Sequence, residues 1–130
     1  MSGEKNLANL LKNMKPVFNS GDFVFCTVSN MDKIDQSQII GSFKEAEGTT
    51  LILSKVYADE MALKYSSIMS WITLQVHSSL EAVGLTAAFS KALADHNISC
   101  NVVAGYYHDH IFVMKKDAEK AIEALRVFSK

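Results

Sequence analysis

Two kinds of hydrophobic periodicity alternate in the second half of the chain, and their order constrains the fold more than any other feature. Residues 67–76 alternate apolar and polar side chains, which predicts a strand, and residues 85–93 space their apolar side chains three and four apart, which predicts a helix. Two β-rich runs at 98–106 and 110–115 predict a hairpin, and Asp117 is expected to cap a final amphipathic helix. The order strand, helix, strand, strand, helix is typical of an α+β, ferredoxin-like half, in which an antiparallel sheet carries its helices on one face.

The first half of the chain contains similar elements after an additional helix. Apolar residues at helical spacing over 7–14 predict this first helix, and Pro16 prevents it from continuing. Gly21 is then expected to open a β-rich strand, a polar loop follows, and a hairpin within 39–54 leads to a helix over 55–64. This half departs from the plain ferredoxin-like order, because a helix precedes its first strand and only a polar loop joins its first two strands.

A faint internal repeat supports a division into two halves. The segments LILSKVYAD and IFVMKKDAE lie sixty residues apart and share a strand, a Lys and the start of a helix. The repeat is weak, since such corners recur by chance. Because no Pro- or Gly-rich linker separates the halves, we expect an N-terminal half over residues 1–66 and a C-terminal half over residues 67–130 that share a core.

Composition excludes several classes of protein. Apolar residues make up 48% and charged residues 21% of the 130 residues, which is ordinary for a globular protein and excludes a disordered one. The 13 Lys and Arg are spread along the chain and the formal net charge is -1, which predicts no nucleic-acid partner. The first residues carry Glu4 and amphipathic spacing in place of an apolar leader, and no apolar run approaches the length of a membrane span. We therefore expect a cytoplasmic protein without a membrane partner, in which Cys26 and Cys100 are reduced core residues.

The segment HSSLEAVGLT, residues 77–86, joins the predicted strand to the predicted helix. A helix that starts near Gly84 leaves its first N–H groups without intrahelical partners, and the helix dipole favours a negative charge there. Gly84 has no Cβ, which lets a ligand approach the backbone closely, and Thr86 adds a hydroxyl. On these residues alone a structural role is the simpler interpretation: Ser78 or Ser79 caps the helix, and Gly84 relieves crowding against the sheet.

Other parts of the chain hold few signals for chemistry. His108 and His110 share one face of the later strand, and His77 offers a third nitrogen, which makes the three a candidate zinc site. No acidic or cysteine ligand stands at a matching spacing, and the pair borders a hairpin turn where polar residues are expected. Neither cysteine neighbours a histidine, and no nucleophile or phosphate-loop motif occurs. We therefore expect no catalytic residue, no metal, no cofactor and no enzymatic activity, with a small metal-dependent hydrolase that uses the histidine pair as the minor alternative.

The stretch VHSSLEAVGLTAAFSKALADHNISCNVVAGYYHDHIFV resembles the ACT domain, a small amino-acid-binding regulatory module, in particular the type found in small uncharacterised bacterial proteins built from two ACT-like halves. The likeness is specific over residues 68–130, and FVFCTV and KEAEGTTLIL are similar to the leading half of those proteins. It implies that ligands, typically amino acids, sit at an interface between ACT units against the loop that holds the family's glycine. Here that residue is Gly84, with Val83 and Leu85 beside it. In arginine-sensing relatives an acidic residue on the later strand also contacts the ligand, and the matching residue is Asp109.

Together these features predict a non-catalytic ACT-type sensor that binds an amino acid or a similar small zwitterion through Val83, Gly84, Leu85, Thr86 and Asp109. Backbone N–H groups at the turn suit an α-carboxylate, and Asp109 suits an ammonium or guanidinium group. The alternative is a structural module whose ACT halves drive oligomerisation with an empty site. Because the open edges of an ACT sheet usually pair with another copy, we expect a homo-oligomer, most simply a two-fold dimer.

Overall fold

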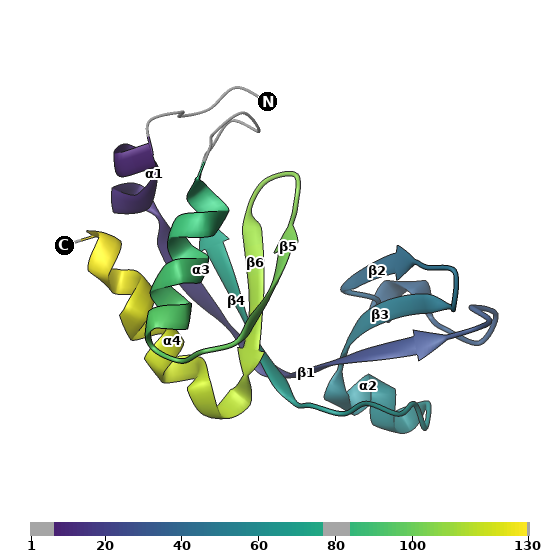
Figure 1. The fold of residues 1–130 in the computed structure, drawn as a ribbon. Helices are drawn as coiled ribbons and strands as arrows, with labels where there is room; N and C mark the ends of the chain where they lie inside the picture. Colours follow the sequence, from purple (N-terminus) through teal and green to yellow (C-terminus); the bar gives the residue numbers. More distant parts are fainter. Residues whose placement is uncertain (1–6, 77–83, 130) are drawn as a thin grey trace. The chain divides into compact units, whose positions relative to one another are not determined.

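A computed structural model describes residues 7–76 and 84–129, and the chain forms two compact units (Figure 1). Unit 1 comprises Met1–Asn19 and Ser70–Lys130, and unit 2 comprises Ser20–Met69. One long strand contributes residues to both units. The N-terminal and C-terminal halves expected from the sequence stay a prediction.

Unit 1 is an α+β unit in which helices cover one face of an antiparallel sheet (Figure 1). Its strands follow the order β1-β4-β6-β5, where β5 and β6 are antiparallel and joined by a turn closed by the hydrogen bond from Gly105 N to His108 O (2.9 Å). The order strand, helix, strand, strand, helix predicted for this part of the chain is confirmed. Its elements are α1 (Leu7–Asn13), β1 (Lys15–Val28, shared with unit 2), β4 (Met69–Gln75), α3 (Leu85–Asp95), β5 (Cys100–Ala104), β6 (Asp109–Met114) and α4 (Ala118–Arg126).

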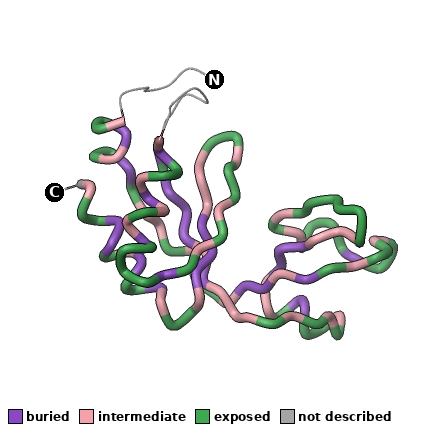
Figure 2. The backbone as a smooth tube through the Cα atoms, in the orientation of Figure 1, coloured by how far each residue is buried: buried purple, intermediate pink, exposed green. Residues whose placement is uncertain are grey.

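The core of unit 1 lies between the sheet and its helices. Ile72 and Leu74 of β4, and Ile111 and Val113 of β6, are fully buried because strand alternation directs them to the helical face. Figure 2 shows buried residues along these strands and on the inner sides of the helices. The helices contribute apolar residues spaced three and four apart, namely Leu85, Phe89 and Leu93 of α3 and Ala121, Ala124 and Leu125 of α4.

Unit 2 has a separate core on one face of the strands β2-β3-β1. The predicted hairpin and helix are confirmed: β2 (Gly41–Lys44) pairs with β3 (Thr49–Ser54), and α2 (Lys55–Glu60) follows directly. The Ser54 hydroxyl caps α2 by accepting a hydrogen bond from Tyr57 N (3.2 Å). The buried core residues are Val24, Cys26, Ile34, Leu51, Leu53, Tyr57 and Ala58.

The first strand begins earlier than the sequence indicates. We expected it to open at Gly21, whereas β1 begins at Lys15 and includes Pro16 as its second residue. Proline fits this place because its fixed φ is compatible with extended backbone near the start of a strand. Gly21 lies inside the strand with φ 110°, a conformation that favours glycine, where the chain passes from unit 1 to unit 2.

Two helix ends also differ from the predictions. The helix expected over 55–64 is shorter, because Ala62 adopts a left-handed conformation (φ 54°) and Leu63 N donates to Ala58 O (2.9 Å), which closes the helix end. Asp117 precedes α4 but its side chain makes no capping hydrogen bond, since the chain enters the helix through a 3-10 turn over Lys115–Asp117. None of the described helices is long and apolar enough to cross a membrane.

Candidate functional site

The turn before α3 places a glycine in a left-handed conformation at the start of the helix. Gly84 is the N-cap residue with φ 90° and ψ -4°, and its carbonyl accepts the hydrogen bond from Ala88 N (2.8 Å). A Cβ at this position would lie 3.3 Å from Leu7 Cδ2 of α1, so glycine is suited to the site both by conformation and by space. Leu85 is buried in the core, whereas Thr86 is exposed. Val83, predicted as a ligand-binding residue, lies outside the described residues, as do the predicted caps Ser78 and Ser79 and the possible zinc ligand His77.

Asp109 is the first residue of β6 and lies on the helical face of the sheet. Strand alternation places it on the same face as Ile111 and Val113, both of which belong to the core under α3 and α4. The residue is half-buried, and no described residue donates a hydrogen bond or forms an ion pair with its carboxylate. Burial raises the pKa of Asp109 above its usual range, against a smaller opposing effect of His110 and His108. A partly buried carboxylate without a partner is suited to a cationic group supplied by a ligand.

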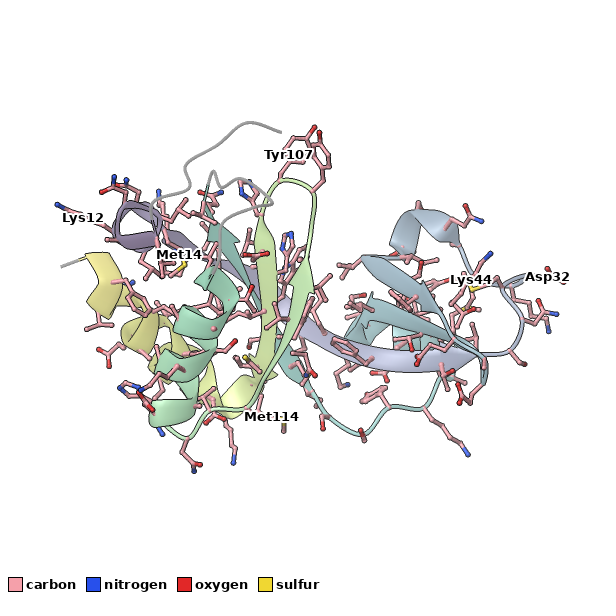
Figure 3. All side chains as sticks on the ribbon, turned by 45° about the horizontal axis from the view of Figure 1, so that its top comes forward. Lys12, Met14, Asp32, Lys44, Tyr107 and Met114 are labelled. Carbon is pink, nitrogen blue, oxygen red and sulfur yellow. The ribbon has the colours of Figure 1, made fainter. Side chains whose placement is uncertain are left out.

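The helix start and the strand start lie at the same end of unit 1. In Figure 1 the N-terminal end of α3 and the β5–β6 hairpin are both at this end, and Figure 3 shows Tyr107 at the tip of the hairpin. Tyr106 and Tyr107 are exposed there, with their rings edge to face at 5.0 Å between centroids. The first N–H groups of α3 can receive an anion, because a helix leaves them without intrahelical acceptors. The arrangement therefore offers donors at the helix start and an acceptor at the strand start.

A polar network on the opposite face of the sheet was not found from the sequence. The Trp71 indole Nε1–H donates to His110 Nδ1 (3.0 Å), and the Thr73 hydroxyl lies 3.2 Å from the same nitrogen. The Asn19 amide donates to Thr73 Oγ1 (2.9 Å) and to Trp71 O (3.2 Å), and Trp71 also stacks on Phe112 at 5.9 Å between centroids. An indole N–H can only donate, so His110 Nδ1 is an acceptor and a neutral His110 carries its proton on Nε2.

This network changes the interpretation of the histidine pair. The sequence suggested His108 and His110 as zinc ligands, but His110 instead directs one ring nitrogen to Trp71. Within residues 7–76 and 84–129, no three His, Cys, Asp or Glu side chains are grouped so that they could hold a metal ion. The signal that could have found the network is Trp71 and Thr73, which alternate with the buried Ile72 and Leu74 and must therefore share the other face.

The network predicts that unit 1 loses stability in mild acid. Burial, followed by the nearby His108, lowers the pKa of His110 below its usual value of 6.5, so the folded state favours the neutral ring. The contribution of neutral His110 to the free energy of unfolding is complete at a pH above the usual pKa of the unfolded state. It is lost as the pH falls from there through the lowered pKa of the folded state. Protonation of His110 at Nδ1 would also direct the new Nδ1–H of the ring at the Trp71 Nε1–H, so that two donors would face each other.

The measurement is urea unfolding of the wild type and His110→Asn between about pH 7.5 and about pH 5.5. Asn can still accept a hydrogen bond from Trp71 but does not titrate, so it serves as the control. The wild type is expected to lose more stability across this interval than the variant. Equal losses would contradict the role assigned to His110.

Comparison with known proteins identifies the family. One family model of the ACT domain matches residues 2–70, and a second ACT model matches residues 66–127. A search of curated proteins gave no match.

Solved structures give two kinds of likeness. A Vibrio cholerae protein of unknown function, described as a possible transport protein, is 51% identical with a TM-score of 0.87, over 99% of this chain and 100% of that chain. An Agrobacterium tumefaciens protein is 18% identical with a TM-score of 0.68, over 89% of each chain. The ligand-free regulatory subunit of aspartate kinase from Thermus thermophilus is 8% identical with a TM-score of 0.62, over 88% of this chain and 97% of that chain. The last two likenesses show the fold alone.

These findings confirm the resemblance noted in the sequence and the ferredoxin-like α+β class. The two models cover consecutive parts of the chain, with a short overlap at residues 66–70. The chain therefore belongs to the ACT domain family.

Proposed function

We propose that this protein is a non-catalytic sensor that binds an amino acid or a similar small zwitterion at the start of α3 in unit 1. The observation that carries the proposal is that two features lie at the same end of the unit: Gly84, left-handed at the N-cap, and the half-buried carboxylate of Asp109, which has no partner among the described residues. Backbone N–H groups would receive the ligand's carboxylate, and Asp109 would receive its ammonium or guanidinium group.

Each residue of the proposed site has a distinct role. Gly84 would let the ligand approach the backbone, and Val83, which lies outside the described residues, is included because the family resemblance places it beside this glycine. Thr86 is exposed and would donate its hydroxyl. Leu85 is buried and would hold the helix start on the core, so we expect it to contribute its N–H and not its side chain. Asp109 would select the cationic group.

Family membership supports this role. ACT domains are typically regulatory and non-catalytic, and they generally bind small molecules. The regulatory subunit of aspartate kinase from Thermus thermophilus shares the fold with this chain. We propose that the chain senses its ligand for a partner and has no catalytic activity, cofactor or metal of its own. Its two cysteines are free, which supports a reducing compartment, and we place the protein in the cytoplasm.

The test is a thermal-shift panel of the common amino acids. A ligand present at a hundred times its dissociation constant adds about 2.7 kcal/mol to the free energy of unfolding. For a chain of this length the expected rise in melting temperature is about 10 °C, from typical unfolding entropies per residue. A flat response across the panel would contradict the sensor and favour a structural oligomerisation module with an empty site.

Either role is compatible with assembly, and we propose that the protein is a homo-oligomer, most simply a two-fold dimer. The end strand β5 supports this, because Cys100–Ala104 contains no charged residue and Val103 is exposed. Uncharged edge strands readily pair with another copy. Sedimentation at tens of micromolar is expected to show a dimer or a larger species, and a monomer would contradict the proposal.

A further inference from the structure

Unit 2 contains a cavity that is separate from the proposed site at Gly84. It has a volume of about 330 Å³ and lies between the loop that follows β1 and the C-terminal end of α2. This volume is at the lower end of the range found for small-molecule sites, which is about 300–1,000 Å³. Its apolar wall consists of Val28, Ile34, Met61 and Leu63. Every lining residue belongs to unit 2.

Hydrogen bonds fix both sides of the cavity. On one side, Ile34 N donates to Met31 O (3.0 Å), and Asp35 N donates to the hydroxyl of the buried Tyr57 of α2 (2.8 Å). On the other side, Leu63 N donates to Ala58 O (2.9 Å), which holds Leu63 against the end of α2. Both loops are therefore tied to the same helix, which holds the two sides of the cavity in place.

The rim of the cavity carries one acidic and one basic side chain. Asp32 and Lys33 are neighbours in sequence, both are exposed, and neither is paired with a described residue. Asn30 completes the rim, and its Oδ1 accepts a hydrogen bond from Asp32 N (2.7 Å), which fixes the turn and leaves the amide N–H groups of Asn30 as donors. The rim thus offers a carboxylate, an ammonium and an amide above an apolar wall.

We propose that this cavity is a second binding site, which takes a small zwitterion with an aliphatic or thioether side chain. The apolar side chain would lie between Ile34, Met61 and Leu63, where its burial is favourable. Lys33 and Asn30 would bind the carboxylate, and Asp32 would bind the ammonium group. Two charges of opposite sign, neither of them paired with a described residue, match a zwitterion better than they match an acid or an amine alone.

The experiment uses the full chain with L-leucine as the probe, and isovaleric acid and isoamylamine as analogues that each lack one of its charges. Methionine methyl groups are labelled and followed by NMR, and the Met61 resonance is assigned with Met61→Leu. Leucine is expected to shift the Met61 resonance in a saturable way and to leave those of Met14 and Met114 unchanged. Each analogue, and leucine with Lys33→Ala or Asp32→Ala, is expected to bind about tenfold more weakly, which is 1.4 kcal/mol.

Three outcomes would overturn the second site: no shift of the Met61 resonance with leucine, binding that is indifferent to both rim variants, or analogues that bind as well as leucine. Asp109→Asn separates this site from the one proposed in unit 1. The Asp109→Asn variant is expected to keep the response of the Met61 resonance to leucine. Loss of this response in Asp109→Asn would assign the binding to the Gly84 turn and overturn the second site. Failure of the unit 1 site alone would leave the Met61 response in place.

Discussion

Replacing Phe89 by Ala is expected to lower the free energy of unfolding of unit 1 by about 3–5 kcal/mol. Phe89 lies in the middle of α3, is fully buried, and belongs to the core formed with β4, β6 and α4. Removing its ring forfeits the transfer free energy of the buried atoms and leaves a cavity that the neighbouring side chains fill only in part. Urea unfolding followed by circular dichroism measures the loss.

Lys91→Ala is the control in the same helix. Lys91 is largely exposed and pairs with Asp95 at 2.8 Å, and an exposed pair of this kind contributes at most about 1 kcal/mol. The expected change is within about 0.5 kcal/mol. If Phe89→Ala cost no more than this control, α3 would not be packed on the sheet as described, and the backbone at Gly84 would lack the support that a preformed site needs.

Much of the architecture of unit 1 could be predicted because its signals are local. The spacing of Leu85, Phe89 and Leu93 and the alternation around Ile72 and Leu74 each mark one buried face within a few residues. The start of β1 could not be predicted in this way. Pro16 and Gly21 both resemble strand breaks in the sequence, yet β1 includes Pro16 near its start and accommodates Gly21 at a positive φ.

The candidate site was predictable only in part, because only some of its features follow from local sequence signals. Gly84 and the start of α3 follow from a local turn, while the role of Asp109 came from family resemblance, since its half-buried surroundings depend on residues far away in sequence. The polar network was missed because its partners are distant: 54 residues separate Asn19 from Thr73, and 39 separate Trp71 from His110. No local pattern encodes such a pair, and only the sheet topology brings them together.

Asp109→Asn is expected to weaken the binding of the amino acid selected by the thermal-shift panel by about 2–5 kcal/mol, the usual cost of removing one partner of a buried charge pair. The same change is expected to leave the stability of the unliganded protein unchanged or slightly higher. Burial raises the pKa of Asp109, which means that ionising the carboxylate costs more free energy in the folded state than in the unfolded state. Asn keeps the shape of the side chain and removes that unfavourable charge.

Calorimetric titration and denaturant unfolding of the same samples test both expectations, with Asp95→Asn as the matched control. Asp95 is exposed at the opposite end of α3, so the control makes the same charge change away from the site and is expected to keep wild-type affinity. Wild-type affinity is also expected to fall as the pH is lowered through the raised pKa of Asp109, because the ligand's cationic group requires the ionised carboxylate. The Asn variant is expected to lack this dependence on pH. A well-folded Asp109→Asn protein with wild-type affinity would exclude Asp109 from the site and would leave only the backbone N–H groups after Gly84 to bind the ligand.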